Sequence, residues 1–333
     1  MDTGYAIEVA VNLFLQSLGD WSYGFMKTIS FLGQEEFFLV LMPFLYWCVD
    51  ASLGLRIGLM LLLSTGINGF FKVLFAGPRP YWFEGSVEGV TGESSFGIPS
   101  GHAQIAASVW GYMAALFKKR AFTIAAIVII FLIGLSRLFL GVHFLRDVLI
   151  GWLIGALLVL LFVRVEPAFI KLVRTWSYPQ KLAGILLGCI ILMIIFLIPH
   201  WLRENYLLPQ DWITNALADV PDVSPQPLSK DGVFTVIGTM LGMLLGYTWF
   251  THKFGNFKTK GKFGVILLRF ALGLSGVLLI WFGLGQVFPR SGDLISYVLR
   301  LFRYTLIGLW VSAIAPVIFI ALRLANQPSK QSR

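Results

Sequence analysis

Long apolar segments, separated by short polar ones, repeat along most of the chain. A helix needs about 20 mostly apolar residues to cross the roughly 30 Å hydrocarbon core of a bilayer. The pattern therefore predicts an all-α, polytopic membrane bundle with nine crossings. The first crossing is the least regular, because polar residues 34–36 interrupt its start. The nine segments are 32–49, 51–76, 101–117, 122–140, 145–164, 181–200, 232–250, 263–286 and 302–323.

The N-terminal segment has a different pattern. Residues 5–18 place apolar side chains at helical spacing, but the run is short and contains Glu8. This pattern favours an amphipathic helix that lies at the membrane interface. The first basic residue is Lys27, and Asp2 and Glu8 precede it, so the sequence predicts no cleaved signal peptide.

Composition excludes several classes of protein. Hydrophobic residues make up 57% of the 333 residues and charged residues 13%, whereas a soluble domain is about 25% charged. A disordered chain is excluded too, because it would need low hydrophobicity and a high density of charge. No basic stripe on a polar surface is visible, so nucleic acid is not an expected partner.

The distribution of charge predicts an orientation. The net charge is +9, and basic residues collect in the cytoplasmic loops of membrane proteins. With nine crossings, the basic clusters at 118–120, 164–181, 253–262 and 323–333 all fall on one side, which is predicted to be cytoplasmic. The N-terminus and the loops 77–100, 141–144, 201–231 and 287–301 then lie outside.

Some polar and small residues have structural interpretations. Gly238, Gly242 and Gly246 line one face of the seventh segment, where small residues allow close packing of helices. His200 and His252 stand singly at segment ends and are interpreted as structural or interfacial.

A first pair of candidate site residues lies at the outer end of the second segment. Lys72 is followed by Gly77 and Pro78, which break the helix, and then by Arg79. Two cations with no acid between them suit one anion. The alternative is that both side chains extend to the membrane interface.

A second candidate opens the third segment with the run Ser100-Gly101-His102. Small residues before a helix N-terminus expose backbone N–H groups, and the helix dipole adds positive potential, so the turn suits phosphate. The alternative role for Ser100 is that of an ordinary N-cap.

A third candidate joins the fourth and fifth segments. Ser136 and Arg137 end the fourth segment, His143 lies in the turn and Asp147 opens the fifth. His143 and Asp147 are four residues apart, so the carboxylate can accept a hydrogen bond from one ring nitrogen and leave the other free as a nucleophile. The alternative is a structural ion pair between Arg137 and Asp147.

Together these pieces read K-x6-R-P, P-S-G-H and S-R-x5-H-x3-D in order. This resembles the three-part signature of the type-2 phosphatidic acid phosphatase family, which shares its site with vanadium haloperoxidases and glucose-6-phosphatase. The resemblance covers about residues 50–165. It implies a phosphatase core at 32–200, after the interfacial segment 1–31, and a C-terminal extension at 201–333 with an external loop and about three transmembrane helices.

The resemblance also implies roles for eight residues and no metal or other cofactor. His143 would attack phosphorus, Asp147 would orient its ring, and His102 would protonate the leaving oxygen and later activate water. The remaining five would hold the phosphoryl oxygens: Lys72, Arg79, Ser100, Gly101 and Arg137.

The implied activity is hydrolysis of a lipid phosphate or pyrophosphate, in a bacterial inner or plasma membrane, with the active site facing outward. Polyprenyl pyrophosphate is the first candidate, because many bacterial relatives act on it. Two alternatives remain: transfer of the phosphoryl group to an acceptor other than water, and a lipid transporter or flippase on the same fold. Membrane lipids are expected partners, and the extra spans would allow a homodimer.

The loops on the outer side leave two questions open. Tyr81, Trp82 and Phe83 are interpreted as part of an interfacial aromatic belt rather than as contacts to a lipid tail. The loop 81–98 is either a mobile lid or a plain surface loop, and the loop 201–231 is a candidate cover of the pocket.

Overall fold

The structure is a computed structural model that describes residues 3–19 and 22–326. Regular structure within these residues is helical, so the predicted all-α fold is confirmed. Lys330 and Arg333, two of the basic residues used for orientation, lie outside the described part of the chain.

The chain forms two compact units, and α4, α8 and α9 run through both. The first unit comprises Met1–Phe37, Ser64–Arg164 and Leu197–Ser229, and the second comprises Phe38–Leu63, Val165–Phe196 and Lys230–Arg333. The helices that run through both are α4 (Ala51–Phe75), α8 (Leu145–Thr175) and α9 (Tyr178–Leu202).

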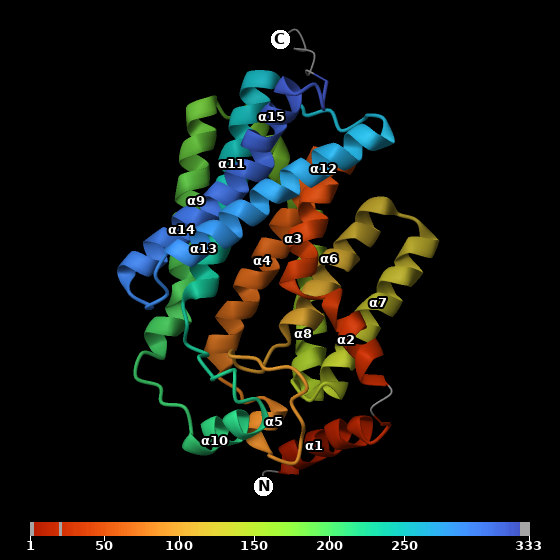
Figure 1. The fold of residues 1–333 in the computed structure, drawn as a ribbon, viewed down its shortest axis with the longest axis vertical. Helices are drawn as coiled ribbons and strands as arrows, with labels where there is room; N and C mark the ends of the chain where they lie inside the picture. The colour runs from red at the N-terminus through yellow and green to blue at the C-terminus, as the bar shows by residue number, and fades with distance from the viewer. Residues whose placement is uncertain (1–2, 20–21, 327–333) are drawn as a thin grey trace. The chain divides into compact units, whose positions relative to one another are not determined.

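Each unit has its own set of helices (Figure 1). The first holds α1 (Thr3–Gln16), α2 (Tyr23–Phe31), α5 (Pro80–Phe83), α6 (Gly101–Phe117), α7 (Arg120–Phe139) and α10 (Gln210–Asp219). The second holds most of α3 (Glu35–Phe44), then η2 (Leu45–Val49), α11 (Asp231–Phe254), α12 (Phe263–Leu278), η3 (Leu279–Gly283), α13 (Leu284–Val287), α14 (Leu294–Leu309), η4 (Trp310–Ile314) and α15 (Ala315–Ala321). The three η elements are single π-helical turns.

The prediction of nine crossings is only partly matched. Within the described residues, seven helices are long and apolar enough to cross a membrane, or eight if the bent pair of α2 with the segment 36–49 counts as one span. The predicted span 101–117 is α6, whose 17 residues extend about 26 Å. That is short of a full bilayer core, because the helix starts only at Gly101 and ends at Lys118, which adopts a left-handed conformation with φ 54°.

Small residues bring α8 against α6 in the first unit. A Cβ at Gly151 would lie 2.7 Å from the Ser100 carbonyl oxygen, and one at Gly155 would lie 2.6 Å from that of Gln104. Only glycine permits such backbone approach. The start of α8, with Asp147, is therefore held beside the start of α6.

A buried polar chain fixes α4 against α6. Gln104 donates from Nε2 to the Ser64 carbonyl at 2.8 Å, and Asn68 donates from Nδ2 to Gln104 Oε1 at 3.0 Å. Asn68 also donates to the Pro99 carbonyl at 3.2 Å. Buried amides need such partners, so the register of α4 is set and Lys72 lies one turn beyond Asn68.

Helix α1 is tied to the ends of α7 and α8. Asn12 is fully buried and donates from Nδ2 to the carbonyls of Leu138 at 2.8 Å and His143 at 3.1 Å. Glu8 accepts the backbone N–H of Arg146 at 2.9 Å and pairs with its side chain. The interfacial position of this segment stays a prediction.

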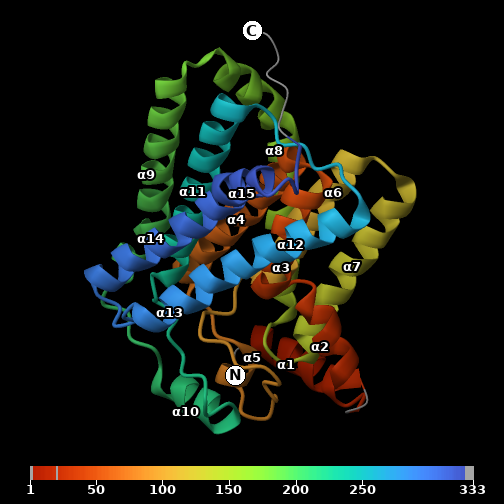
Figure 2. The ribbon, with the colours of Figure 1, turned by 45° about the horizontal axis from the view of Figure 1, so that its top comes forward.

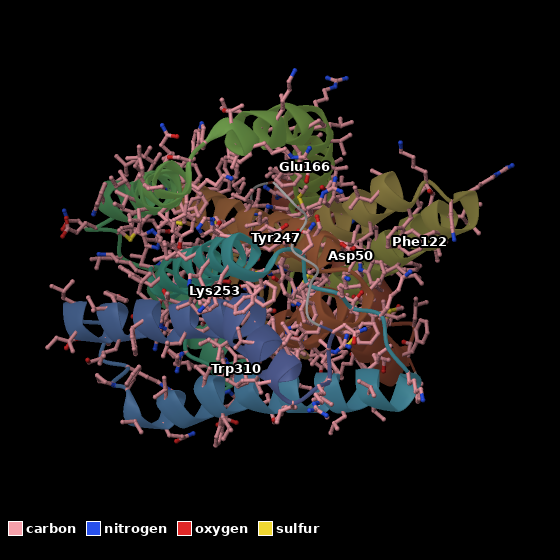
Figure 3. The ribbon with its side chains drawn as sticks, turned by 90° about the horizontal axis from the view of Figure 1, so that it is seen from above. Asp50, Phe122, Glu166, Tyr247, Lys253 and Trp310 are labelled. Carbon is pink, nitrogen blue, oxygen red and sulfur yellow. The ribbon has the colours of Figure 1, made fainter. Side chains whose placement is uncertain are left out.

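In the second unit, α11 and α14 run side by side (Figures 1 and 2). A Cβ at Gly242 would overlap the carbonyl oxygen of Thr305, and one at Gly246 would overlap Ser312. The packing interpretation of these glycines is confirmed. Helices α12 and α14 are also joined: Trp310 lies between them and donates from Nε1 to the Gly273 carbonyl at 2.8 Å (Figure 3).

Replacing Gly242 with leucine should lower the free energy of unfolding by about 2 kcal/mol, since overpacking a tight contact costs roughly 1–3 kcal/mol. Thermal unfolding in detergent, followed by tryptophan fluorescence, measures the change. Gly232→Leu in the same helix is the control, because a Cβ there meets nothing within 4 Å. Equal melting temperatures for the two variants would contradict the packing described for α11 and α14.

Candidate active site

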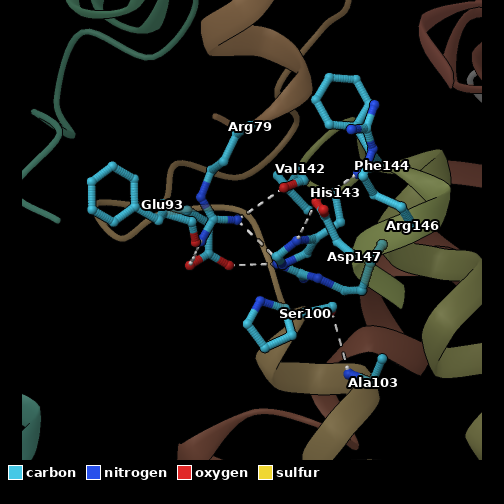
Figure 4. Close-up of polar contacts among 12 residues, drawn as sticks. Arg79, Glu93, Ser100, Ala103, Val142, His143, Phe144, Arg146 and Asp147 are labelled. Carbon is cyan, nitrogen blue, oxygen red and sulfur yellow. Dashed lines mark hydrogen bonds and ion pairs between the residues drawn. The ribbon is translucent and has the colours of Figure 1, made fainter. Parts of the chain in front are cut away.

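The eight predicted site residues all lie in the first unit, on α4, α6, α7, α8 and the loops beside them. Arg79 ends the short link after α4, Ser100 precedes α6, and His143 lies in the turn between α7 and α8. Figure 4 shows Arg79 reaching between Glu93 on one side and His143 on the other.

The ring of His143 is held at both nitrogens. Nδ1 lies 3.3 Å from Asp147 Oδ2, and Nε2 lies 3.3 Å from Arg79 Nη1. A guanidinium can only donate, so Nε2 acts as an acceptor, and the proton of a neutral ring sits on Nδ1 facing the carboxylate. The geometry thus leaves a lone pair on Nε2, directed toward Arg79.

Two further contacts support that geometry. Asp147 Oδ2 also accepts the backbone N–H of Phe144 at 2.9 Å, which fixes the carboxylate in the turn. His143 is 1% exposed. Burial, followed by the positive charges of Arg79 and Lys72, lowers the pKa of His143 well below its ordinary value of 6.5, so the ring is neutral at pH 7.

Arg79 is the most highly connected side chain of the site. It donates from Nε to the Ser95 carbonyl at 2.6 Å, from Nη2 to Ser95 Oγ at 3.0 Å and from Nη1 to the Val142 carbonyl at 2.9 Å. These contacts join the loop before α6 to the turn before α8. The guanidinium plane is therefore fixed beside His143.

Glu93 bridges the two site arginines. Its Oε1 lies 2.5 Å from Arg137 Nη2, and its Oε2 lies 3.5 Å from Arg79 Nη2. Burial alone would raise the pKa of Glu93, but Arg79 and Arg137 outweigh it and hold the pKa at about 2. A carboxylate therefore sits, ionised, where the two arginines converge.

Arg137 does not form the structural pair with Asp147 that was the alternative to a functional role. It donates from Nη1 to Ser30 Oγ at 2.6 Å and pairs with Glu93 instead. Its Nε has no hydrogen-bond partner in the described part of the chain, and the side chain is fully buried. Arg137 thus retains an unused donor.

Lys72 reaches the same loop from α4. Its Nζ donates to the carbonyl of Phe96, and the side chain is 9% exposed. Gly97 follows, and a Cβ there would lie 3.1 Å from Asp147 Oδ2. The loop before α6 therefore passes between Lys72 and Asp147.

Ser100 caps the start of α6, which is the alternative role that the sequence indicated for it. Ser100 Oγ accepts the backbone N–H of Ala103 at a long 3.5 Å, and its own N–H donates to the Asp147 carbonyl at 2.9 Å. Among the described residues, the buried Nε2 of His102 has no hydrogen-bond partner. A buried ring nitrogen without a partner is suited to a bound oxygen.

Sequence reasoning missed the bridging role of Glu93. In the sequence Glu93 is one of three acids in the loop 81–98, and no motif spacing links it to the arginines. The same holds for Ser30 and Asn12, whose contacts depend on how α1 and α2 pack.

The aromatic residues after Arg79 are not an interfacial belt. Tyr81 is 1% exposed and Trp82 is fully buried, in a cluster with Phe96 and Phe139. The belt interpretation was wrong for these two, because α10 packs over α5: Asn215 donates to the Trp82 carbonyl at 3.1 Å.

The loop 81–98 is tied down rather than free. Tyr81 hydrogen-bonds with the backbone of Glu93, and the N–H of Gln226 donates to the Ser94 carbonyl at 2.8 Å. Asp219 accepts the N–H of Gly89. The segment 201–231 therefore covers this loop, whose carbonyls in turn accept hydrogen bonds from Arg79 and Lys72.

Within the described residues, no group of three or more His, Cys, Asp or Glu is placed to hold a metal ion.

Family models match two parts of the chain. The model of the PAP2 superfamily matches residues 53–171, which include all eight site residues. The model of the transmembrane extension of PAP2 superfamily phosphatases matches residues 234–327. The two matches fall on the motif region and on most of the second unit.

Several known proteins are similar to this chain. Human sphingosine-1-phosphate phosphatase 2 is 27% identical over 67% of this chain and 51% of its own length. Phosphatidylglycerophosphatase B of Bacillus subtilis is 32% identical over 41% of this chain and 72% of its own length. Glucose-6-phosphatase 3 of Bos taurus is 28% identical over 47% of this chain and 53% of its own length.

A solved structure is also similar: a transmembrane PAP2-type phosphatidylglycerolphosphate phosphatase of Bacillus subtilis. It is 27% identical with a TM-score of 0.45, covering 50% of this chain and 88% of that one. The chain spans about half the length of the sphingosine-1-phosphate and glucose-6-phosphate phosphatases that it matches. The motif residues, the two family models and the bacterial relative together show that this multi-span integral membrane protein belongs to the PAP2 superfamily.

Proposed function

We propose that the protein is a lipid phosphatase that hydrolyses a lipid phosphate or pyrophosphate through a phosphohistidine intermediate, with no metal. One observation carries the proposal: the neutral ring of His143 is fixed by Asp147 at Nδ1 and presents the lone pair of Nε2 beside Arg79. An oriented nucleophile next to a cation suits attack on an anionic phosphorus centre.

Substrate binding would use the cations around Glu93. Arg79 and Arg137 already hold one carboxylate between them, and Lys72 approaches the same loop. A phosphoryl group would take the place of the carboxylate, with the hydroxyl of Ser100 and the backbone N–H of Gly101 nearby at the start of α6. The side chain of Glu93 would then have to turn away from the two arginines, while its loop keeps its backbone contacts.

The chemistry would proceed in two steps. In the first, Nε2 of His143 bonds to phosphorus and the bond to the leaving oxygen breaks, while His102 gives that oxygen a proton. In the second, His102 takes a proton from water, the water oxygen bonds to phosphorus, and the bond to His143 breaks. Asp147 compensates the positive charge that the phosphorylated ring carries.

The names of the relatives guide the choice of substrate. Two of the three kinds of relative are named as lipid phosphatases: one for sphingosine 1-phosphate and one for phosphatidylglycerophosphate. The third is a glucose-6-phosphatase. The chemistry that these names share is a phosphate monoester. We keep polyprenyl pyrophosphate as a candidate beside the two lipid monoesters, because the cradle of three cations suits a highly charged headgroup.

We also propose that the site faces away from the cytoplasm, in a bacterial plasma membrane. The basic run at 118–120 joins α6 to α7 at the ends opposite His102 and Arg137, so the positive-inside rule supports this side. The division into a segment 1–31, a core at 32–200 and an extension at 201–333 is likewise a proposal. The ranges of the two family matches support it.

The experiment is phosphate release from purified protein in detergent with excess EDTA. Phosphatidylglycerophosphate, sphingosine 1-phosphate, phosphatidic acid and polyprenyl pyrophosphate are offered in parallel. We expect EDTA to leave release from at least one of them unchanged, because Lys72, Arg79 and Arg137 neutralise the phosphoryl group. Loss of all release in EDTA that returns with added Mg²⁺ would contradict the mechanism. Transfer of the phosphoryl group to an added alcohol, without release of inorganic phosphate, would favour phosphotransfer.

Glu93 gives a second test of the binding mode. Because its carboxylate competes with phosphate for two arginines, Glu93→Gln should strengthen inhibition by inorganic phosphate about tenfold, or about 1.4 kcal/mol. The pKa of about 2 means that Glu93 stays ionised from pH 5 to 8. Glu84→Gln is the control in the same loop, since among the described residues the side chain of Glu84 hydrogen-bonds with Ser86 alone. Weaker phosphate inhibition in Glu93→Gln would show that Glu93 organises the arginines instead.

A further inference from the structure

The second unit contains one buried arginine without an acceptor. Four arginines are buried in the described part of the chain, and three have hydrogen bonds that account for them: Arg79, Arg137 and Arg269. Arg269, in the same unit as the fourth, donates to the carbonyls of Trp47, Thr259 and Leu324. The fourth is Arg303 on α14, which is 8% exposed.

Among the described residues, Arg303 forms neither a hydrogen bond nor an ion pair. Its buried Nε has no partner, and its recorded contact is with the ring of Tyr304, whose centroid lies 4.9 Å from its guanidinium carbon. Buried charged groups are normally paired, because an unpaired one loses its hydration without compensation. Arg303 therefore lacks an anion.

The described part of the second unit has no spare carboxylate to supply that anion. Each of its four acidic residues in the described part of the chain already has another partner. Asp50 caps α4, Glu166 pairs with Arg56, Asp231 pairs with Arg300, and Asp293 caps α14. The described carboxylates of this unit therefore do not supply the missing anion.

A second arginine converges on the same place. A Cβ built on Gly285 would lie 2.7 Å from Arg303 Nη1 and 3.9 Å from Arg290 Nη2. Taken end to end, these two distances place the nitrogens at most 6.6 Å apart. Arg290 also donates to the Gly285 carbonyl at 2.9 Å. Two cations that close repel each other unless an anion lies between them.

The position of Gly285 explains how the guanidinium of Arg303 reaches its buried place. Gly285 lies in α13, directly after the π-helical turn η3, and Figures 1 and 2 show α13 beside the start of α14. The missing side chain of Gly285 leaves the space that Arg303 Nη1 occupies. Any larger residue would displace the guanidinium.

We infer that Arg303 and Arg290 form a binding site for a phosphate oxyanion, carried by a lipid headgroup or by free phosphate. Guanidinium groups match phosphate because they donate two parallel hydrogen bonds to it. Arg303 lies one turn, about 4.5 Å, along α14 from Arg300, which pairs with the first residue of α11. A site so close to the helix ends lies at the depth of lipid headgroups.

The surroundings favour a lipid as the source. Large apolar side chains around the site are strongly exposed on this unit, and they would contact acyl chains beside a bound headgroup. They include Phe282 at 62%, Val287 at 76%, Leu294 at 75% and Ile295 at 65% exposed.

Native mass spectrometry of delipidated protein in nonionic detergent tests the inference. The ligands are phosphatidylglycerol, inorganic phosphate and, as a lipid without phosphate, dioleoylglycerol. We expect one bound phosphatidylglycerol and no retained dioleoylglycerol. Arg303→Gln should weaken phosphatidylglycerol binding at least tenfold and Arg290→Gln at least threefold. Arg174→Gln, which removes an exposed charge from the same unit, should change it less than twofold.

Thermal unfolding separates binding from a structural role. Without lipid, Arg303→Gln should melt at or above the wild-type temperature, because it removes an uncompensated buried charge. Phosphatidylglycerol should raise the wild-type melting temperature but not that of the variant. If inorganic phosphate alone reproduces the rise, the ligand is the free anion. Two results would overturn the inference. One is that both arginine variants bind lipid and phosphate as the wild type does. The other is that Arg290→Gln binds normally but melts at a lower temperature without lipid.

Discussion

His143→Gln should reduce phosphate release by at least about a thousandfold, since loss of a nucleophile leaves only the contribution of binding and charge stabilisation. Glutamine keeps a polar group of similar reach in the turn, but it offers no ring nitrogen to bond to phosphorus. The expected signature is a loss of kcat with little change in the binding of phosphate, because Arg79 and Arg137 remain. Initial rates across substrate concentrations measure both quantities.

The matched control is His252→Gln. His252 is exposed in the second unit and stacks on Tyr178, with ring centroids 4.2 Å apart. This substitution should leave turnover within twofold of the wild type. A His143→Gln protein that unfolds normally in detergent and still releases phosphate at a near-normal rate would show that the nucleophile is another group. A transporter on this fold would instead release no phosphate from either the wild type or the variant.

Asp147→Asn should lower kcat by roughly a hundredfold to ten-thousandfold, the range that neutralising the carboxylate partner of a catalytic histidine can reach. The amide oxygen can still accept from Phe144 N–H and from His143 Nδ1, so the turn should keep its shape. The negative charge that compensates the phosphorylated ring is lost, and KM should change little.

Asp211→Asn, on an exposed position of α10, is the control for loss of one negative charge. The discriminating readout is the division between kcat and KM. A large rise in KM with unchanged kcat would mean that Asp147 shapes the binding site and does not support the nucleophile.

The sequence could indicate the separate pieces of the candidate site because each piece is local. The pair His143 and Asp147 is four residues apart, and Ser100 directly precedes a helix, so short-range geometry fixes both. Assembly of the pieces depended on family resemblance, since nothing in their spacing places Arg79 beside His143. The roles of these residues stay predictions until variants are measured.

Other features depend on tertiary packing that no local pattern encodes. Glu93 meets two arginines only because the loop before α6 folds back and is covered by 201–231. Trp82 resembles an interfacial residue in sequence, yet α10 buries it. The span count differed for another reason. The segment 101–117 forms α6 with the predicted bounds, but its 17 residues are short for a crossing, and the first segment is divided between α3 and a π-helical turn.

The unpaired Arg303 shows a similar limit in the second unit. In sequence it is one of several basic residues at the outer end of a span, and extension to the interface explains such residues adequately. Only the structure shows that Gly285 admits it to a buried position and that every nearby acid is already paired.

The central claim is that His143 carries the phosphoryl group, and a burst experiment with His102→Ala tests it most directly. p-Nitrophenyl phosphate releases a leaving group that needs no proton, so the first step should survive the loss of His102 while hydrolysis slows. We expect a rapid burst of one nitrophenolate per enzyme. The trapped phosphate should be acid-labile and alkali-stable, and peptide mapping should locate it on His143. The absence of a burst and of any phosphoenzyme in His102→Ala, or a phosphate on another residue, would contradict the account.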